Sequence, residues 1–138
     1  MVKTGRIQIE SAGKFSTFVI TEEARRFVSE SGLREGSLTV FLQHTTGSVM
    51  IVEHEAGFLV DLEDTLERLV PLEGNYHHHL VGFDRNGAVH VRSALLSASV
   101  TVPVQDGELL LGTYQDIMVL DMQRESAPRS LILQVMGE

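Results

Sequence analysis

Short runs in which apolar and polar residues alternate dominate the sequence, and such runs predict β-strands. Residues 7–10 alternate with a period of two, residues 11–13 include a turn glycine, and residues 15–20 resume the apolar pattern, so the chain is expected to open with a β-hairpin. Further strand-like runs follow, separated by turn residues, at 38–42, 49–52, 89–91, 99–104, 109–111, 117–120 and 131–135. The final third of the chain is therefore predicted to be mostly sheet.

Two segments instead repeat their apolar residues at helical spacing. Between Glu55 and Val70 the apolar residues recur at steps of three and four, and Pro71 ends the pattern. An earlier helix is expected to have Thr21 as its N-cap residue and to end at Gly32. Residues 71–87 are rich in turn-forming residues and predict a long loop. Together these elements predict an α+β fold in which one domain, residues 1–138, places two main helices on a mostly antiparallel sheet.

Composition narrows the chemistry more than the fold. A chain of 138 residues can hold one hydrophobic core, and the absence of cysteine excludes disulfides, iron–sulfur clusters, cysteine zinc sites and thiol nucleophiles. Eleven basic against 19 acidic residues, a net charge of −8, argue against broad nucleic-acid binding, which depends on Lys and Arg. The chain shows neither a signal peptide nor an apolar run long enough to span a membrane, so a cytoplasmic protein with no membrane partner is expected.

Histidine is the residue type that stands out, with six copies of which four lie between positions 77 and 90. His44 ends an apolar run and is followed by Thr45, Thr46, Gly47 and Ser48. Hydroxyls and backbone amides can surround an imidazole in such a segment, which suits a metal ligand, a general base or an oxyanion contact. A structural histidine at the end of a strand is the alternative.

Histidines from separate segments could complete a metal site. In an extended run only alternate residues share a face, so His78 is expected to point away from His77 and His79, and the three are not expected to share one metal. His90 lies between two valines in a strand-like alternation. Three neutral imidazoles from separate elements, with a fourth position open to water, form the pattern of an open zinc site. Solvent-exposed loop histidines without a shared site are the alternative.

Two acidic residues follow the second apolar run. If Glu53 ends a strand beside the His44 strand, its carboxylate could orient an imidazole or act as a base. Glu55 is instead expected to complement the positive end of the helix that follows it. Asp61, on the flank of the helical apolar stripe, is expected to be solvated.

Polar groups in the last third of the chain could bind a ligand. Residues 112–115 place a glycine, a hydroxyl, an aromatic ring and an amide between two predicted strands, where they could bond a polar ligand. The alternative there is a β-turn with Tyr114 in the core. Arg92, Arg124 and Arg129 could each clamp a phosphate or carboxylate, although solvation at the surface is the default for each.

An ordered series of short motifs resembles the signature of the YjbQ family, and it comprises residues 41–48, 51–53, 61–62, 69–71, 76–78, 86–90, 95–96, 102–104, 107 and 111–115. The resemblance covers roughly residues 36 to 136 and rests on the order and spacing of many motifs. Members are described as secondary thiamine-phosphate synthases with an α+β fold that assembles as a homotrimer, and the resemblance implies these properties here. The chain departs from the usual pattern at Tyr114, where tryptophan is common, at Ser97, where glycine is common, and after Arg129, where a second arginine is common.

The resemblance also assigns residues to roles. The family's histidine before paired hydroxyls corresponds to His44, the histidine two residues after the loop tyrosine to His78, and the histidine after the asparagine-containing turn to His90. Together with the residue chemistry above, it implies a catalytic set of His44, Glu53, His78, His90 and Gln115, and a ligand-binding set of Thr45, Thr46, Ser48, Gly112, Thr113 and Arg129. The expected cofactor is a divalent metal, zinc before magnesium, held by His44, His78 and His90.

Two hypotheses follow. The first is an enzyme-like site that acts on a small phosphorylated substrate, either with a metal or as a metal-free proton-transfer cluster. The implied reaction joins a pyrimidine pyrophosphate to a thiazole phosphate. A departing pyrophosphate normally requires Mg²⁺ and several cations, which are scarce here, so this reaction could be a side activity. The second hypothesis is a non-catalytic metal- or anion-binding trimer.

Overall fold

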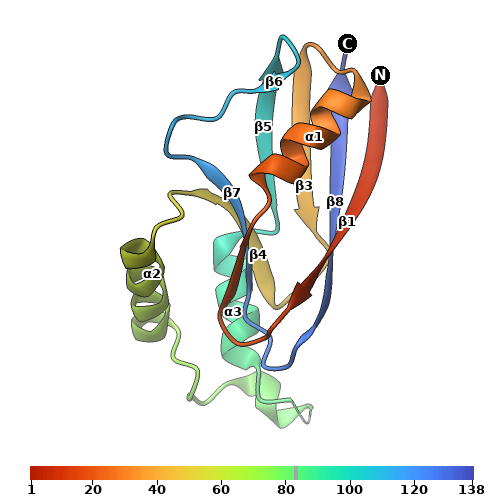
Figure 1. The fold of residues 1–138 in the computed structure, drawn as a ribbon. Helices are drawn as coiled ribbons and strands as arrows, with labels where there is room; N and C mark the ends of the chain where they lie inside the picture. The colour runs from red at the N-terminus through yellow and green to blue at the C-terminus, as the bar shows by residue number, and fades with distance from the viewer. Residues whose placement is uncertain (83) are drawn as a thin grey trace.

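The computed structural model describes residues 1–82 and 84–138, and in them two antiparallel sheets form the body of an α+β domain (Figure 1). The five-stranded sheet has the order β1-β8-β3-β5-β6, formed by β1 (Val2–Ser11), β8 (Ala127–Gly137), β3 (Gly36–Leu42), β5 (Ser99–Gln105) and β6 (Glu108–Leu109). The three-stranded sheet has the order β2-β7-β4, formed by β2 (Ser16–Val19), β7 (Asp116–Asp121) and β4 (Gly47–Val52). The predicted fold class is therefore confirmed.

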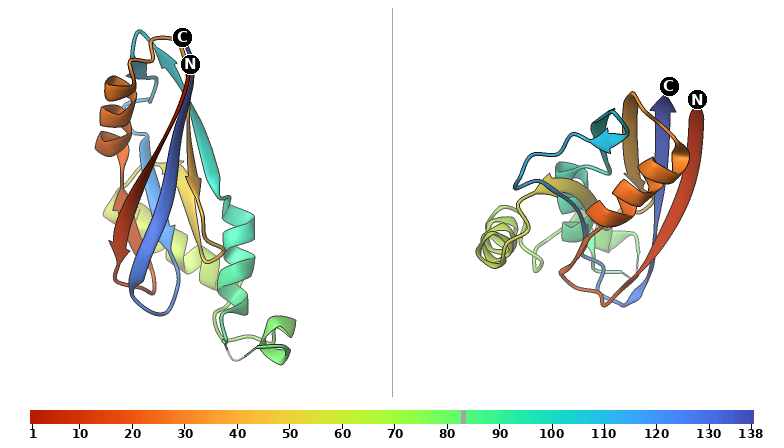
Figure 2. Two further views of the ribbon diagram at one scale, coloured as in Figure 1. Left: turned by 90° about the vertical axis from the view of Figure 1, so that its right-hand side faces the viewer. Right: turned by 45° about the horizontal axis from the view of Figure 1, so that its top comes forward.

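Helices surround the sheets on different sides. Helix α1 (Thr21–Ser31) lies across the five-stranded sheet, α3 (Gly87–Leu96) packs beside β4, and α2 (Ala56–Leu69) stands off to one side (Figures 1 and 2). A short 3₁₀ helix, η1 (His77–Leu80), precedes α3. In the described part of the chain, none of these helices combines the length and the hydrophobicity that a bilayer crossing requires.

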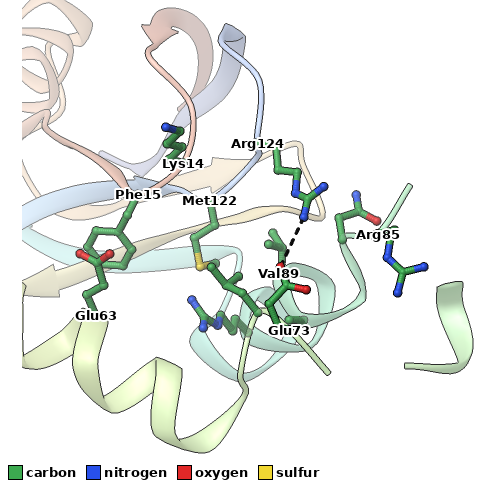
Figure 3. A pocket seen from close by; sticks show the side chains of 12 residues that line it. Lys14, Phe15, Glu63, Glu73, Arg85, Val89, Met122 and Arg124 are labelled. Atoms are coloured by element: carbon green, nitrogen blue, oxygen red, sulfur yellow. Dashed lines mark ion pairs between the residues drawn. The ribbon is translucent and has the colours of Figure 1, made fainter. Parts of the chain in front are cut away.

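The core follows directly from the alternation in the strands. Leu131, Leu133 and Val135 of β8 point inward and are almost fully buried together with Val28 of α1. Burying each such side chain stabilises the fold by about 1.5–3 kcal/mol. A second, smaller apolar cluster contains Phe15, Val89 and Met122, whose side chains gather in Figure 3. This second cluster connects α3 to the three-stranded sheet.

The expected N-terminal hairpin is wrong. β1 pairs with β8 from Val2↔Met136 to Ser11↔Ala127, while β2 pairs with β7, so the two runs enter different sheets. Thr21 is also not an N-cap residue, because it lies inside α1, where its Oγ1 donates to Asp116 Oδ1 at 2.7 Å and accepts from the Ile117 N–H at 3.0 Å. The predicted end of this helix at Gly32 is confirmed.

Residues 89–91 are helical, which corrects the strand predicted there and adds a third α-helix to the expected two. Three residues are too few to separate a period of 2 from a period of 3.6. The buried residues Ala88, Val89, Arg92 and Ser93 form one helical face. Ser93 Oγ donates to the Gly47 carbonyl at 2.6 Å and fixes this face against β4.

Candidate functional site

His44, His78 and His90 line one open cavity of about 770 Å³. The connection between β3 and β4 supplies His44, Thr45 and Thr46, η1 supplies His78, and α3 supplies His90. Arg129 of β8 also lines it, as does Asn86, the residue before α3. Three of the histidines singled out from the sequence therefore meet at one cavity although they come from three separate segments.

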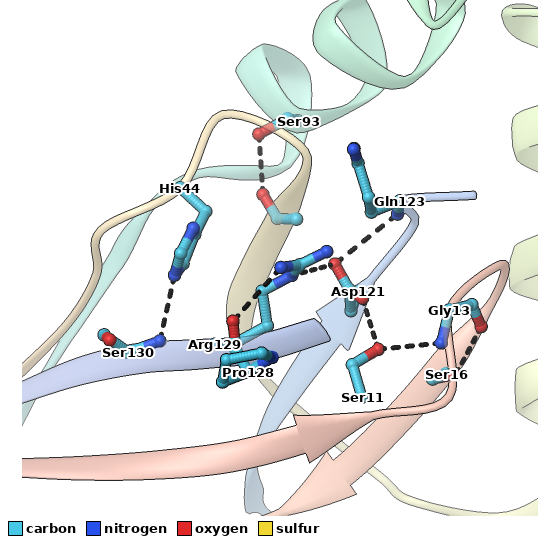
Figure 4. A network of polar contacts seen from close by, with 11 residues as sticks. Ser11, Gly13, Ser16, His44, Ser93, Asp121, Gln123, Pro128, Arg129 and Ser130 are labelled. Atoms are coloured by element: carbon cyan, nitrogen blue, oxygen red, sulfur yellow. Dashed lines mark hydrogen bonds and ion pairs between the residues drawn. The ribbon is translucent and has the colours of Figure 1, made fainter. Parts of the chain in front are cut away.

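A backbone amide fixes the state of His44. The Ser130 N–H donates to His44 Nε2 at 2.9 Å, so this nitrogen carries the lone pair and the neutral ring has its proton on Nδ1 (Figure 4). Burial lowers the pKa of His44, the nearby Arg129 guanidinium lowers it further, and the Asp121 carboxylate partly opposes both. His44 is therefore held as a neutral imidazole near neutral pH.

His90 has the same tautomer as His44, but its other ring nitrogen is the one held by the backbone. Its Nδ1 lies 3.0 Å from the Thr45 carbonyl oxygen, and because a carbonyl only accepts, Nδ1 must carry the proton. The basic nitrogen is then Nε2. The ring of His78 meets the His90 ring edge-on, with centroids 4.7 Å apart and planes at 71°.

His78 lies apart from His77 and His79, as expected, but the triplet is not an extended strand. Residues 77–80 form a 3₁₀ helix with three residues per turn, so the expected alternation of an extended run is wrong. His79 Nε2 accepts from the Gly87 N–H at 3.0 Å and thereby holds the start of α3. His77 and His79 line a different cavity from His78. Desolvation, followed by the charge of Arg85, lowers the pKa of His79.

The fit to a metal is incomplete within one subunit. Among residues 1–82 and 84–138, no three histidine or carboxylate side chains are grouped closely enough to hold an ion. His44 already uses its Nε2 lone pair to accept from Ser130. The arrangement therefore suits proton transfer or anion binding better than the expected three-histidine zinc site.

Arg129 is buried in an ion pair rather than solvated at the surface. Its Nε donates to Asp121 Oδ1 at 2.9 Å, and the side chains of Arg129 and Asp121 are only 9% and 2% exposed. Ser11 Oγ donates to the other oxygen of Asp121 (Figure 4). Asp121 was missed in the sequence, although an acidic residue that ends the apolar run 117–120 is a signal for a buried charge that needs a partner.

Several other predicted site residues lie far from the histidines in one subunit. β4 and β7 pair from Gly47↔Asp121 to Val52↔Asp116. Glu53 and Gln115 lie next to the Val52–Asp116 end of this pairing, whereas the His44 segment lies next to the Gly47–Asp121 end. The two ends are five strand residues apart, which is about 17 Å. β3 and β4 also belong to different sheets, so Glu53 does not end a strand beside that of His44.

Of the smaller polar residues predicted to bind a ligand, some line the histidine cavity and others lie elsewhere. Thr45 and Thr46 line the histidine cavity, but Ser48 donates to the Ser97 carbonyl at 2.6 Å and has a structural role. Gly112 and Thr113 lie in a turn closed by the Gln115 N–H, which donates to the Gly112 carbonyl at 3.1 Å. The predicted turn is present, but its Tyr114 is 74% exposed and is not part of the core.

Comparison with known proteins agrees with the fold and the motif order. A family model described as "UPF0047 protein YjbQ-like" matches residues 5–138. A UPF0047 protein of Mycobacterium tuberculosis is 40% identical over 114 residues, which cover 83% of this chain and 84% of that protein. A UPF0047 protein of Methanothermobacter thermautotrophicus is 35% identical over 121 residues, which cover 88% of this chain and 83% of the relative.

Solved structures extend the similarity to the whole fold. A YbjQ-like protein of unknown function from Sulfolobus solfataricus superposes with a TM-score of 0.94 at 26% identity and covers 100% of this chain and 99% of its own. A hypothetical protein from Aeropyrum pernix gives a TM-score of 0.91 at 28% identity, with 99% of each chain covered. The match to the family model and the curated relatives show that the chain belongs to the YjbQ-like UPF0047 family.

Proposed function

We propose that the histidine cavity is an acid–base site that acts on a small phosphorylated substrate. The observation that carries this proposal is that two rings of the same Nδ1-protonated tautomer leave opposite nitrogens free. Thr45 engages the Nδ1–H of His90 and leaves its basic Nε2, while Ser130 engages Nε2 of His44 and leaves its Nδ1–H. One cavity thus offers both a proton acceptor and an N–H donor. Resemblance to secondary thiamine-phosphate synthases supplies the first reaction to test.

The proposed roles follow from these tautomers. His90 Nε2 takes a proton from an N–H of the substrate as pyrophosphate leaves, and returns it once the new carbon–nitrogen bond to the thiazole has formed. The adjacent His78 ring lies where it can share the charge in the meantime. His44 Nδ1–H and the Thr45 and Thr46 hydroxyls bind the substrate's anionic oxygens. Arg129, whose charge is balanced by Asp121, orients this wall of the cavity. Glu53 and Gln115 have no part in this step within one subunit.

Metal binding at this cavity would require one more ligand than His78 and His90 supply. A zinc or, second, a magnesium ion on His78 and His90 would need His44 to leave Ser130, or a ligand from another copy of the chain. We propose a homotrimer as the assembly, and apolar side chains at the surface support this, since Leu80 is 80% exposed, Leu95 is 66% exposed and Phe41 at the cavity is 43% exposed.

One observation favours a second candidate function, a non-catalytic metal- or anion-binding trimer. Arg129 is the single Lys or Arg among the described residues that line the histidine cavity, and Asp121 neutralises it. A cavity with so little free positive charge is poorly suited to stabilise a departing pyrophosphate. It can still hold a small anion through the His44 N–H and the threonine hydroxyls.

The test compares two histidines on neighbouring segments. Untagged wild type, His90→Gln and the matched control His77→Gln are assayed for thiamine-phosphate formation from the pyrimidine pyrophosphate and the thiazole phosphate. His90→Gln is expected to lower kcat about 100-fold or more, since it removes the general base. His77→Gln should keep wild-type turnover, because His77 lines another cavity.

Further measurements separate the candidates. Equal turnover in His90→Gln and wild type would contradict the acid–base role. Elemental analysis by plasma mass spectrometry reports bound metal, and sedimentation reports the assembly state. A trimer that binds phosphate or zinc without turnover in any variant would favour the second candidate.

A further inference from the structure

We propose that a second cavity, which borders the histidine cavity at Asn86, binds a small organic anion with an apolar body and an N–H donor. The cavity has a volume of about 340 Å³ and is the more enclosed of the two. Figure 3 shows residues from the β1–β2 connection, α2, the segment after α2, α3 and the segment after β7 around it. This inference goes beyond the proposed function, because none of the three histidines of the histidine cavity lines the second cavity.

Positive charge gathers around this cavity although the protein is acidic. Lys14, Arg85, Arg92 and Arg124 line it, four of the 11 basic residues in a chain of net charge −8. Arg92 is committed to the fold, since it donates to Glu67 at 2.7 Å and to the Val70 carbonyl at 2.9 Å. The remaining three cations outnumber the two carboxylates in the lining, Glu63 and Glu73. Such a local excess of positive charge selects an anion.

The exposed ion pair between Arg124 and Glu73 can be exchanged for a ligand. Arg124 Nη2 lies 3.9 Å from Glu73 Oε1, and the two side chains are 63% and 87% exposed (Figure 3). An exposed pair at this distance contributes little stability. A carboxylate or phosphate on the ligand can therefore replace Glu73 at Arg124 and form a closer, charge-assisted bond.

The inner wall of the cavity is apolar and firmly packed. Val89 and Met122 are 3% and 4% exposed, and Phe15 packs against the same cluster. An aromatic or aliphatic ring placed on these side chains would lose its contact with water, as is typical of small-molecule sites. The wall thus accounts for the apolar body of the ligand.

Asn86 is the reason to expect an N–H donor on the ligand. The residue is only 9% exposed, and its side-chain Oδ1 has no hydrogen-bond partner among the described residues. Although Asn86 precedes α3, its side chain does not cap the helix. A buried acceptor without a partner is unfavourable, so a ligand N–H that reaches Oδ1 gains affinity that a ligand without a donor lacks. This amide makes the site specific for more than charge.

The test uses two probes that differ in one hydrogen. Indole-3-acetate has a flat apolar ring, a carboxylate and a ring N–H, whereas 1-methylindole-3-acetate lacks the N–H. Methyl NMR of the five methionines reports the location of binding, with Met122 in the cavity and the exposed Met136 on β8 as an internal control. We expect a saturable shift of Met122 alone, with the methylated probe binding about tenfold more weakly.

Charge variants supply the matched comparison. Arg124→Gln should weaken binding of indole-3-acetate about tenfold, while Glu73→Gln should strengthen it, because the competing carboxylate is gone. Arg34→Gln, an exposed arginine that pairs with Asp106 elsewhere, should leave affinity unchanged. Asn86→Ala should remove the preference for the N–H probe.

Three results would overturn the proposal. They are an unmoved Met122 at millimolar probe, equal affinity for the two probes, and shifts confined to the ring signals of His44 and His90, which would place the anion in the histidine cavity. Direct binding does not depend on turnover. Failure here is therefore distinguishable from failure of the proposed function.

Discussion

Removing one partner of the buried pair between Asp121 and Arg129 should destabilise the protein strongly. In Asp121→Leu, the Arg129 guanidinium stays in a site where it is 9% exposed and loses its carboxylate. The Ser11 hydroxyl also loses its acceptor. An uncompensated buried charge costs about 3–5 kcal/mol. For a chain of this size that corresponds to a fall in Tm of about 10–20 °C.

The double variant Asp121→Leu/Arg129→Met is the control. It removes both charges and replaces them with apolar side chains, so most of the lost stability should return. Urea unfolding followed by circular dichroism measures each variant, since the chain has no tryptophan. A single-variant loss below about 1 kcal/mol would refute the reasoning, because that is the size of an ordinary substitution.

The same variants have a second readout at His44. Burial is the largest cause of its lowered pKa and remains in all variants, but Arg129 lowers the pKa and Asp121 raises it. Arg129→Met should therefore move the pKa of His44 upward and Asp121→Leu should move it downward. NMR titration of the ring signals distinguishes the two shifts. Movement in the same direction would mean that general loosening, and not charge, controls this histidine.

Three further predictions concern the fold. Because folding lowers the pKa of His44 below 6.5, the unfolded chain binds more protons and stability should fall as the pH drops below that value; urea midpoints should show a weaker pH dependence in His44→Gln. Glu55→Ala removes the acceptor for the first amides of α2, so that helix should lose about 1 kcal/mol and exchange its amide hydrogens faster, while α1 is unchanged. Gly36→Ala should lower Tm far more than Gly32→Ala, because a Cβ at Gly36 collides with the Met136 carbonyl whereas the space around Gly32 is open; equal losses would contradict this explanation.

Elements with several repeats of one period were predictable from the sequence. The expected helix between Glu55 and Val70 is α2, and the runs at 38–42 and 131–135 lie in β3 and β8. Strand partners were not predictable, since β1 pairs with a strand from the opposite end of the chain and no local pattern specifies that pairing. The strand at 89–91 failed because packing against β4 decided the conformation of a very short pattern.

The candidate site was predictable in part. His44, His78 and His90 were identified from the resemblance, and all three line one cavity. The position of Glu53 depended on which strands are neighbours, and that is a property of the whole sheet. Ser97 departs from the family pattern at a position where glycine is common. Its φ of +95° explains the usual glycine, because glycine adopts positive φ more easily than serine does.

The bond between Ser130 and His44 makes a side chain part of a β-ladder. β3 and β8 pair up to Leu42↔Leu131, and the Gln43 N–H then donates to the Ser130 carbonyl at 3.2 Å. The next bond would need a main-chain carbonyl, but the imidazole takes its place and accepts the Ser130 N–H. If His44 Nε2 took up a proton, its N–H would point at the Ser130 N–H, and two donors would face each other without an acceptor. The end of the ladder would then open, so that the pairing length of two strands depends on the charge of one ring.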